Sequence, residues 1–124
     1  MLRRKVTKQL VNWKNHSKKA LLVTGARQIG KSYAIREFGK AEYACYFEVN
    51  LLLDKTAREA LIDAENAMDF INRVALLSDR PLVEGKTLIF IDEIQEYPEI
   101  VTLMKALTED GRYSFVFSGS MLGT

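Results

Sequence analysis

Short apolar runs alternate with amphipathic stretches along this chain of 124 residues. Four runs are rich in aliphatic, β-branched or aromatic residues, which predicts buried strands over residues 20–24, 43–49, 87–91 and 113–117. Apolar residues at helical spacing predict helices over 2–14, over 31–38 with a stop at Gly39, over 55–78, and from Pro98 to Gly111. In the long helix over 55–78, a single buried face would include Ala57, Met68, Ile71 and Ala75.

Strands that alternate with helices predict βαβ units, and therefore an α/β fold with a parallel sheet covered by helices on both faces. In such sheets, ligands bind at the carboxyl ends of the strands. The loops that follow Thr24, Val49, Ile91 and Phe117 are therefore the places where chemistry is expected.

Composition places the chain among soluble globular domains, with 48% hydrophobic and 27% charged residues. No apolar run approaches the ~20 residues that cross a bilayer, and the first residues carry no signal-peptide core, so we expect a cytoplasmic protein with no membrane partner. Cys45 and His16 are the only cysteine and histidine, too few for a zinc cluster. We expect Cys45 to be a small core residue.

Charge is unevenly distributed. Residues 1–19 hold seven of the 18 basic residues and no acid, whereas the remaining residues are net acidic. This predicts a basic N-terminal helix over 1–19, followed by a core domain over 20–124. The basic face is either a binding surface for nucleic-acid phosphates or a solvated helix face, and the lack of interleaved aromatic residues favours the second interpretation.

The segment between the first predicted strand and the next helix reads GARQIGKS and fits the pattern G-x-x-x-x-G-K-[ST]. Glycines allow a loop whose backbone N–H groups cradle phosphate oxygens, and the following helix presents its positive end to the same anion. Lys31 is expected to reach the β- and γ-phosphates, and Ser32 to bind Mg²⁺. The predicted nucleotide-binding residues are Gly25, Ala26, Arg27, Gln28, Ile29, Gly30, Lys31 and Ser32.

Two further strand ends carry candidate catalytic side chains. Asp92 directly follows the run TLIFI and is expected to hold Mg²⁺ through water beside the phosphates. Glu93 comes next and is placed to polarise the water that attacks the γ-phosphate. Ser118 follows the last predicted strand, where its hydroxyl is either a contact for the γ-phosphate or attacking water, or part of an ordinary turn.

The motifs GARQIGKS, LIFIDEIQ and FVFSGSMLG, preceded by a basic helix with Trp13, resemble the N-terminal part of a prokaryotic family of AAA-type ATPases. The resemblance implies a three-layer P-loop core with strand order 5-1-4-3-2, binding of ATP or ADP with Mg²⁺, and ATP hydrolysis. It implies Walker A roles for Lys31 and Ser32, Walker B roles for Asp92 and Glu93, and a sensor role for Ser118.

Members of this family continue past the position of Thr124 with a fifth strand, a lid and a C-terminal domain. We therefore expect this chain to be the N-terminal part of a longer ATPase, and we expect Mg²⁺-dependent ATP hydrolysis of the full-length protein. Without a fifth strand, the run over 20–24 would be a sheet edge through which copies could self-associate.

Two other functions fit the phosphate loop. One is a small-molecule or nucleoside kinase, although a carboxylate at Glu93 that activates water favours hydrolysis over transfer to another acceptor. The other is a nucleotide switch without hydrolysis, or a DNA-binding module, for which DNA affinity would fall steeply with salt.

Overall fold

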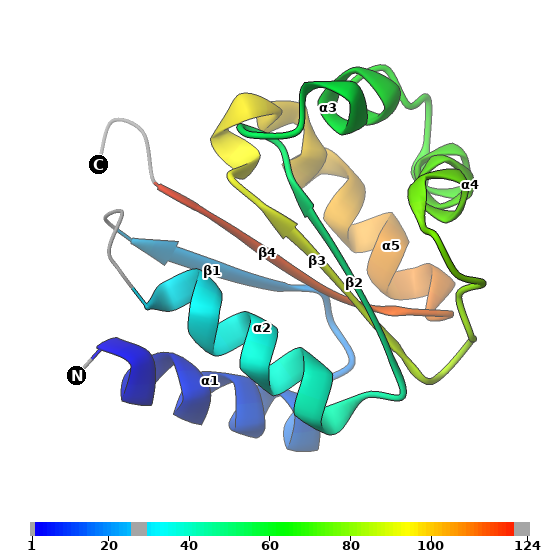
Figure 1. Ribbon diagram of the computed structural model, residues 1–124. Helices are drawn as coiled ribbons and strands as arrows, with labels where there is room; N and C mark the ends of the chain where they lie inside the picture. Colours follow the sequence, from blue (N-terminus) through cyan, green and yellow to red (C-terminus); the bar gives the residue numbers. More distant parts are fainter. Residues whose placement is uncertain (1, 26–29, 121–124) are drawn as a thin grey trace.

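One parallel sheet forms the centre of the computed structural model, which describes residues 2–25 and 30–120. Its four strands lie in the order β1-β4-β3-β2 (Figure 1). Their bounds are β1 (Leu21–Gly25), β2 (Cys45–Asn50), β3 (Thr87–Asp92) and β4 (Ser114–Ser120). The α/β fold with a parallel sheet, predicted from the alternation of strands and helices, is confirmed.

Helices cover both faces of the sheet (Figure 1). On one face lie α1 (Leu2–His16) and α2 (Lys31–Glu42). On the other lie α3 (Lys55–Leu61), α4 (Ala67–Leu77) and α5 (Met104–Asp110), together with the short 3-10 helices η1 (Ile94–Glu96) and η2 (Pro98–Leu103). A separate apolar core fills the space on each side of the sheet.

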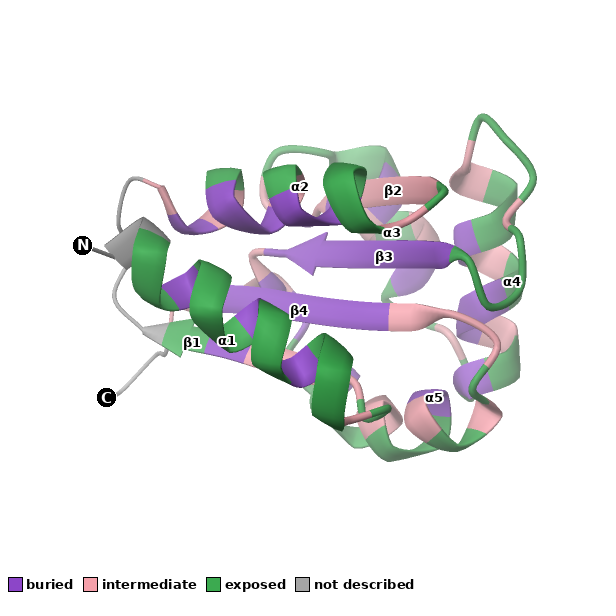
Figure 2. Cartoon of the chain, turned by 90° about the horizontal axis from the view of Figure 1, so that it is seen from below, coloured by how far each residue is buried: buried purple, intermediate pink, exposed green. Residues whose placement is uncertain are grey.

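The two inner strands are the most deeply buried elements (Figure 2). Every residue of β3 is buried, as expected for a strand covered on both faces. In β4, the five residues from Phe115 to Gly119 are buried. Consequently the carboxyl ends of β3 and β4 are held by packing on both sides, which makes them a rigid base for a site.

Helix α1 packs onto α2 through Val6, Leu10 and Trp13, which meet Ile35 and Phe38 in the same core. The helical spacing of these apolar residues predicted this buried face. The Trp13 indole N–H also donates a hydrogen bond of 2.6 Å to the Lys19 carbonyl, which fixes the turn into β1. The basic side chains of Arg4, Lys5, Lys8 and Lys14 lie exposed on the outer face of the helix.

The long helix predicted over 55–78 is wrong, because two separate helices occupy this stretch. The α3 helix ends at Leu61, and α4 begins after Asn66, whose side chain accepts a hydrogen bond from the Asp69 N–H. This N-cap restarts the helix with a different phase, so the predicted single apolar face does not exist. Met68 is half exposed and Ala75 is exposed, whereas Ile71 is buried as predicted, together with Phe70 and Val74.

The predicted stop of the second helix at Gly39 is also wrong, since α2 continues to Glu42. Gly39 is buried against the ring of Tyr46, and a Cβ at this position would collide with the Tyr46 ring atoms. The glycine therefore permits a close approach of α2 to β2 and does not end the helix. Gly111 does end α5, with a φ of 72° at the C-cap.

Two smaller expectations also need correction. The strand predicted over 113–117 extends to Ser120, so Ser118 lies inside β4 and is not in a turn. Cys45 begins β2 and is only half-buried, so it is not a core residue. Among the residues that the structure describes, no helix has the length and apolar character needed to span a membrane.

Candidate functional site

The carboxyl ends of β1, β3 and β4 meet at one edge of the sheet. Thr24 and Gly25 of β1 pair with Gly119 and Ser120 of β4, and β3 ends beside them at Asp92. The α2 helix begins at the same edge, after Gly30, whose φ of 107° is the left-handed conformation that glycine tolerates best. The positive end of the α2 dipole is therefore directed toward this edge.

Lys31 is the first residue of α2 and is buried, with only 6% of its surface exposed. Its Nζ lies 3.4 Å from the Gly119 carbonyl oxygen at the end of β4. Among the described residues, this carbonyl is the one hydrogen-bond acceptor of the ammonium group, which carries three donors. The arrangement is suited to an anion placed between β1, β4 and α2.

Ser32 and Asp92 are in direct contact. The Ser32 hydroxyl donates a hydrogen bond of 2.6 Å to the Asp92 carboxylate, which also accepts one of 2.8 Å from the Glu93 N–H. Burial raises the pKa of Asp92 above its ordinary value, and these two hydrogen bonds only partly oppose the effect. The structure thus brings together a serine and an aspartate that are sixty positions apart in the chain.

Glu93 has a left-handed backbone, with φ 59° and ψ 48°. Among the described residues, it is the only non-glycine residue with a positive φ, a conformation that is costly for side chains with a Cβ. The Gln95 amide donates a hydrogen bond of 2.5 Å to the Glu93 carboxylate. Backbone strain and this hydrogen bond together fix the orientation of the Glu93 side chain at the strand end.

Ser118 is fully buried in β4, and its hydroxyl has no hydrogen-bond partner. The Gln95 side-chain oxygen is likewise buried and unpartnered, and these two are the unsatisfied buried side-chain atoms in the part of the chain that the structure describes. Gly119 lies beneath Gln95, where a Cβ would come within 2.6 Å of the Gln95 oxygen. Unsatisfied buried polar atoms are costly, so their gathering at one edge points to a site where a ligand or water completes them.

The remaining predicted residues of the phosphate loop are Ala26, Arg27, Gln28 and Ile29, and they lie outside the described residues. The structure brings together the others on which the prediction depended: Gly25 at the end of β1, Gly30 at the N-cap of α2, Lys31 and Ser32 on α2, Asp92 and Glu93 at the end of β3, and Ser118 in β4. Their roles toward a nucleotide stay predictions.

Sequence reasoning did not find a polar network one helical turn below Ser32. The Arg36 guanidinium donates two hydrogen bonds of 2.8 Å to the Glu48 carboxylate, which also accepts one of 2.6 Å from the Tyr46 hydroxyl. Burial alone would raise the pKa of Glu48, but the hydrogen bonds from Arg36 and Tyr46 outweigh it, so that the pKa lies below its ordinary value. The network ties α2 to β2.

Asn50 is the last residue of β2, and its polar groups turn the chain toward α3. Its side-chain oxygen accepts hydrogen bonds of 2.9 Å from the backbone N–H groups of Leu52 and Leu53, and its carbonyl accepts one from Asp54. All acceptor groups of Asn50 are thus used to turn the chain into α3.

A buried parallel sheet with a glycine-capped helix, a buried lysine and a serine–aspartate contact at its carboxyl edge defines the P-loop class of α/β proteins. A family model described as an AAA domain matches residues 17–124. The chain therefore belongs to the AAA domain family, whose domains bind nucleotides. No curated protein matches the chain.

Proposed function

We propose that this protein binds ATP or ADP together with Mg²⁺ at the edge formed by β1, β3, β4 and α2, and that it hydrolyses ATP. The observation that carries the proposal is the contact of 2.6 Å between Asp92 and Ser32, the residue that directly follows the buried Lys31. A phosphate chain beside α2 would meet a helix dipole, a lysine and a hydroxyl at once.

The oxygen donors at this edge fit Mg²⁺. Magnesium is a hard cation that is bound by one or two carboxylates, hydroxyls, water and substrate phosphates. Within the described ranges, no group of three or more His, Cys, Asp or Glu side chains could hold a metal by itself. Ser32 and Asp92 would therefore share the ion with the nucleotide, and the ion would neutralise charge on the phosphates.

Hydrolysis would use Glu93 as the base. The water oxygen attacks the γ-phosphorus, the bond to the bridging β–γ oxygen breaks, and the water proton passes to the Glu93 carboxylate. The Gln95 amide donates a hydrogen bond to one oxygen of the Glu93 carboxylate and so helps to orient this base. The Ser118 hydroxyl, which has no hydrogen-bond partner in β4, would donate a hydrogen bond to the γ-phosphate or to the attacking water.

Isothermal titration of ATP with Mg²⁺ tests the binding proposal. Lys31→Ala should weaken binding by about tenfold or more, because a hydrogen bond to a charged group is worth about 1.5–3 kcal/mol. Lys105→Ala, which removes an exposed lysine from α5, is the matched control and should bind like the wild type. Equal affinity of all three proteins would contradict the proposal.

A further inference from the structure

The outer edge of β2 is open. In the order β1-β4-β3-β2, β2 is the last strand on its side among the residues that the structure describes. Cys45 and Leu51 donate backbone hydrogen bonds of 3.0 Å to the carbonyls of Lys86 and Asp92, respectively. The backbone N–H and C=O groups of successive strand residues point in alternate directions. Those of the odd-numbered residues of β2 therefore point to β3, and those of Tyr46 and Glu48 point away from the sheet.

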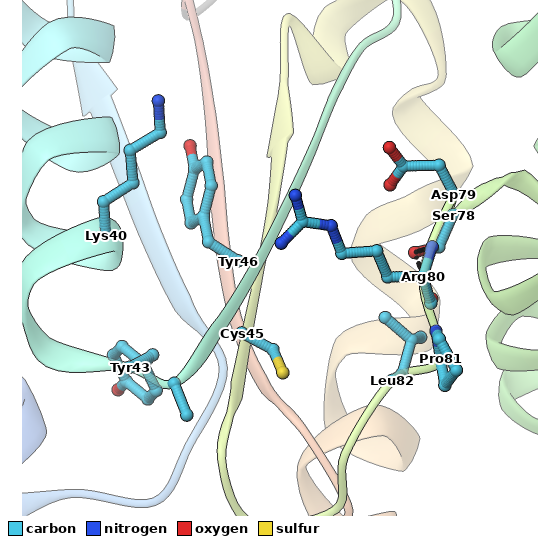
Figure 3. Close-up of a pocket in the computed structure, with 10 residues that line it drawn as sticks. Lys40, Tyr43, Cys45, Tyr46, Ser78, Asp79, Arg80, Pro81 and Leu82 are labelled. Atoms are coloured by element: carbon cyan, nitrogen blue, oxygen red, sulfur yellow. Dashed lines mark hydrogen bonds between the residues drawn. The ribbon is translucent and has the colours of Figure 1, made fainter.

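This open edge lies at the floor of a groove of about 380 Å³ near the start of β2 (Figure 3). One wall is the end of α2, with Lys40 and the following Tyr43. The other wall is the segment from Ser78 to Leu82, which connects α4 to the strand β3. The groove is therefore open along the strand and walled by an element from each face of the sheet.

The second wall, from Ser78 to Leu82, is held in place by hydrogen bonds within the chain. The Ser78 hydroxyl donates a hydrogen bond of 2.6 Å to the Arg80 carbonyl and accepts one of 3.2 Å from the Arg80 N–H. Further along, the Thr87 hydroxyl donates 2.7 Å to the Val83 carbonyl and thereby ties the segment to the start of β3. A preformed wall lowers the entropic cost of binding.

We propose that this groove binds an extended, acidic peptide segment of a partner protein, which adds to the sheet as a further strand beside β2. The backbone groups of Tyr46 and Glu48 would supply the main-chain hydrogen bonds of this strand addition. The side chains on one face of the added strand would pack on Pro81 and Leu82, and those on the other face would lie along Lys40 and Tyr43.

The charged side chains that line the groove favour an acidic peptide. Lys40 and Arg80 are exposed and stand on opposite walls, against a single acid, Asp79, in the lining (Figure 3). The Glu48 carboxylate, on the floor strand, is already neutralised by Arg36. A second copy of this chain paired through β2 would bring four of these cations together, whereas a strand with glutamate side chains would meet opposite charge on both walls.

Cys45 provides a direct readout, because it lines the groove and is the only cysteine in the chain. The probe is a seven-residue peptide with blocked ends and the sequence Val-Val-Glu-Glu-Val-Val-Glu, which presents glutamate on both faces of an extended strand. At ten times its dissociation constant, it should slow alkylation of Cys45 by iodoacetamide about tenfold. It should also slow hydrogen exchange at the N–H groups of Tyr46 and Glu48, which a purely side-chain contact would leave unchanged.

Two matched peptides separate strand addition from simple charge attraction. The same peptide with N-methyl groups on alternate residues lacks the donors for a strand pair, and a version with lysine in place of glutamate reverses the charge. Both should protect Cys45 much less. Equal protection by the methylated peptide, or no protection by the glutamate peptide, would overturn the proposal.

Two protein variants make the same test from the other side of the contact. Lys40→Glu combined with Arg80→Glu should weaken binding of the glutamate peptide by roughly five- to tenfold, as expected for the loss of two exposed charge pairs. Because both side chains are exposed, the fold should persist, which nucleotide binding verifies independently. The control, Lys105→Glu, should bind the peptide like the wild type, and an equal loss in this control would count against the groove.

Discussion

Glu93 combines a left-handed backbone, a hydrogen bond from Gln95 and a position directly after the Mg²⁺ candidate Asp92. A strained conformation of this kind persists only when the surrounding structure imposes it, and such conformations gather at functional sites. Here the surroundings are the buried β3 strand before Glu93 and the 3-10 helix η1 after it. The strained backbone therefore helps to set the orientation of the Glu93 carboxylate.

At this position, Glu93→Gln should preserve ATP affinity and abolish most hydrolysis. The amide has nearly the same shape as the carboxylate but cannot accept a proton from water, and general-base catalysis contributes about 10²- to 10⁴-fold. Phosphate release in a long single-turnover experiment, compared with titration of ATP, measures the two effects separately. Undiminished phosphate release would show that Glu93 is not the base.

Asp92 makes the stability of the nucleotide-free protein depend on pH. Its pKa is raised mainly by burial, so the folded state binds a proton more tightly than the unfolded state. The folded protein therefore loses stability as the pH rises from the ordinary carboxyl range through the raised pKa. Asp92→Asn should remove this loss and be more stable than the wild type at neutral pH, by about 1 kcal/mol.

Urea unfolding of both proteins between pH 4 and pH 7, without nucleotide, measures this difference. Groups other than Asp92 contribute equally to both curves, so the difference between them isolates this residue. A gap between the curves that does not widen as the pH rises would contradict the assignment.

Sequence reasoning located the residues of the site that lie within contiguous motifs at strand ends. Lys31 and Ser32 follow a glycine loop, and Asp92 and Glu93 directly follow an apolar run, so spacing alone indicates their shared edge. Arg36 and Glu48 could not be paired in this way. Their contact depends on which face of β2 turns toward α2, and that depends on strand register and on the close packing at Gly39.

At the scale of elements, the network of Arg36, Glu48 and Tyr46 holds α2 against β2, and with it the helix that carries Lys31 and Ser32. Arg36→Leu should destabilise the protein by about 1–2 kcal/mol at pH 7, because it leaves the half-buried Glu48 carboxylate without its partner. This loss of stability is small for a broken ion pair because Arg36 is partly exposed, with 37% of its side chain accessible to solvent.

The effect of Arg36→Leu should also depend on pH. Because the pKa of Glu48 is lowered, its contribution is present above the ordinary carboxyl pKa and is lost as the pH falls through the lowered value. The difference in the free energy of unfolding between Arg36→Leu and the wild type should therefore become smaller at acidic pH. Glu48→Gln is the matched control and should remove most of this pH dependence, whereas a gap of constant size would argue against the ion pair.

The helices were predicted less well than the strands, and α3 and α4 show why. Apolar spacing continues across residues 62–66, so the periodicity does not reveal the break. The break comes from Asn66, which caps α4, and from Arg73, which donates hydrogen bonds to Asp63 and to the Ala60 carbonyl and so fixes the turn between the two helices. These are polar contacts between residues that lie close in the chain, and a pattern of hydrophobic residues does not encode them.

At the scale of the whole molecule, β1 is the outer strand on the other side of the sheet among the described residues. Its residues Leu21, Leu22 and Val23 carry no charge, and an uncharged outer strand of this kind is a template for pairing with other chains. We expect the chain to self-associate, with a sedimentation coefficient that rises with protein concentration. A monomer throughout the concentration series would contradict this prediction.

The packing of α1 has a practical consequence for anyone who expresses this domain. The family match begins at residue 17, but Val6, Leu10 and Trp13 of α1 cover Ile35 and Phe38 on the helix that carries the lysine and serine of the site. A gene trimmed to the matched boundary would leave this apolar surface of α2 facing solvent. The product would be prone to precipitate, and a negative result in nucleotide-binding assays would then reflect the choice of cloning boundary and not the chemistry of the site.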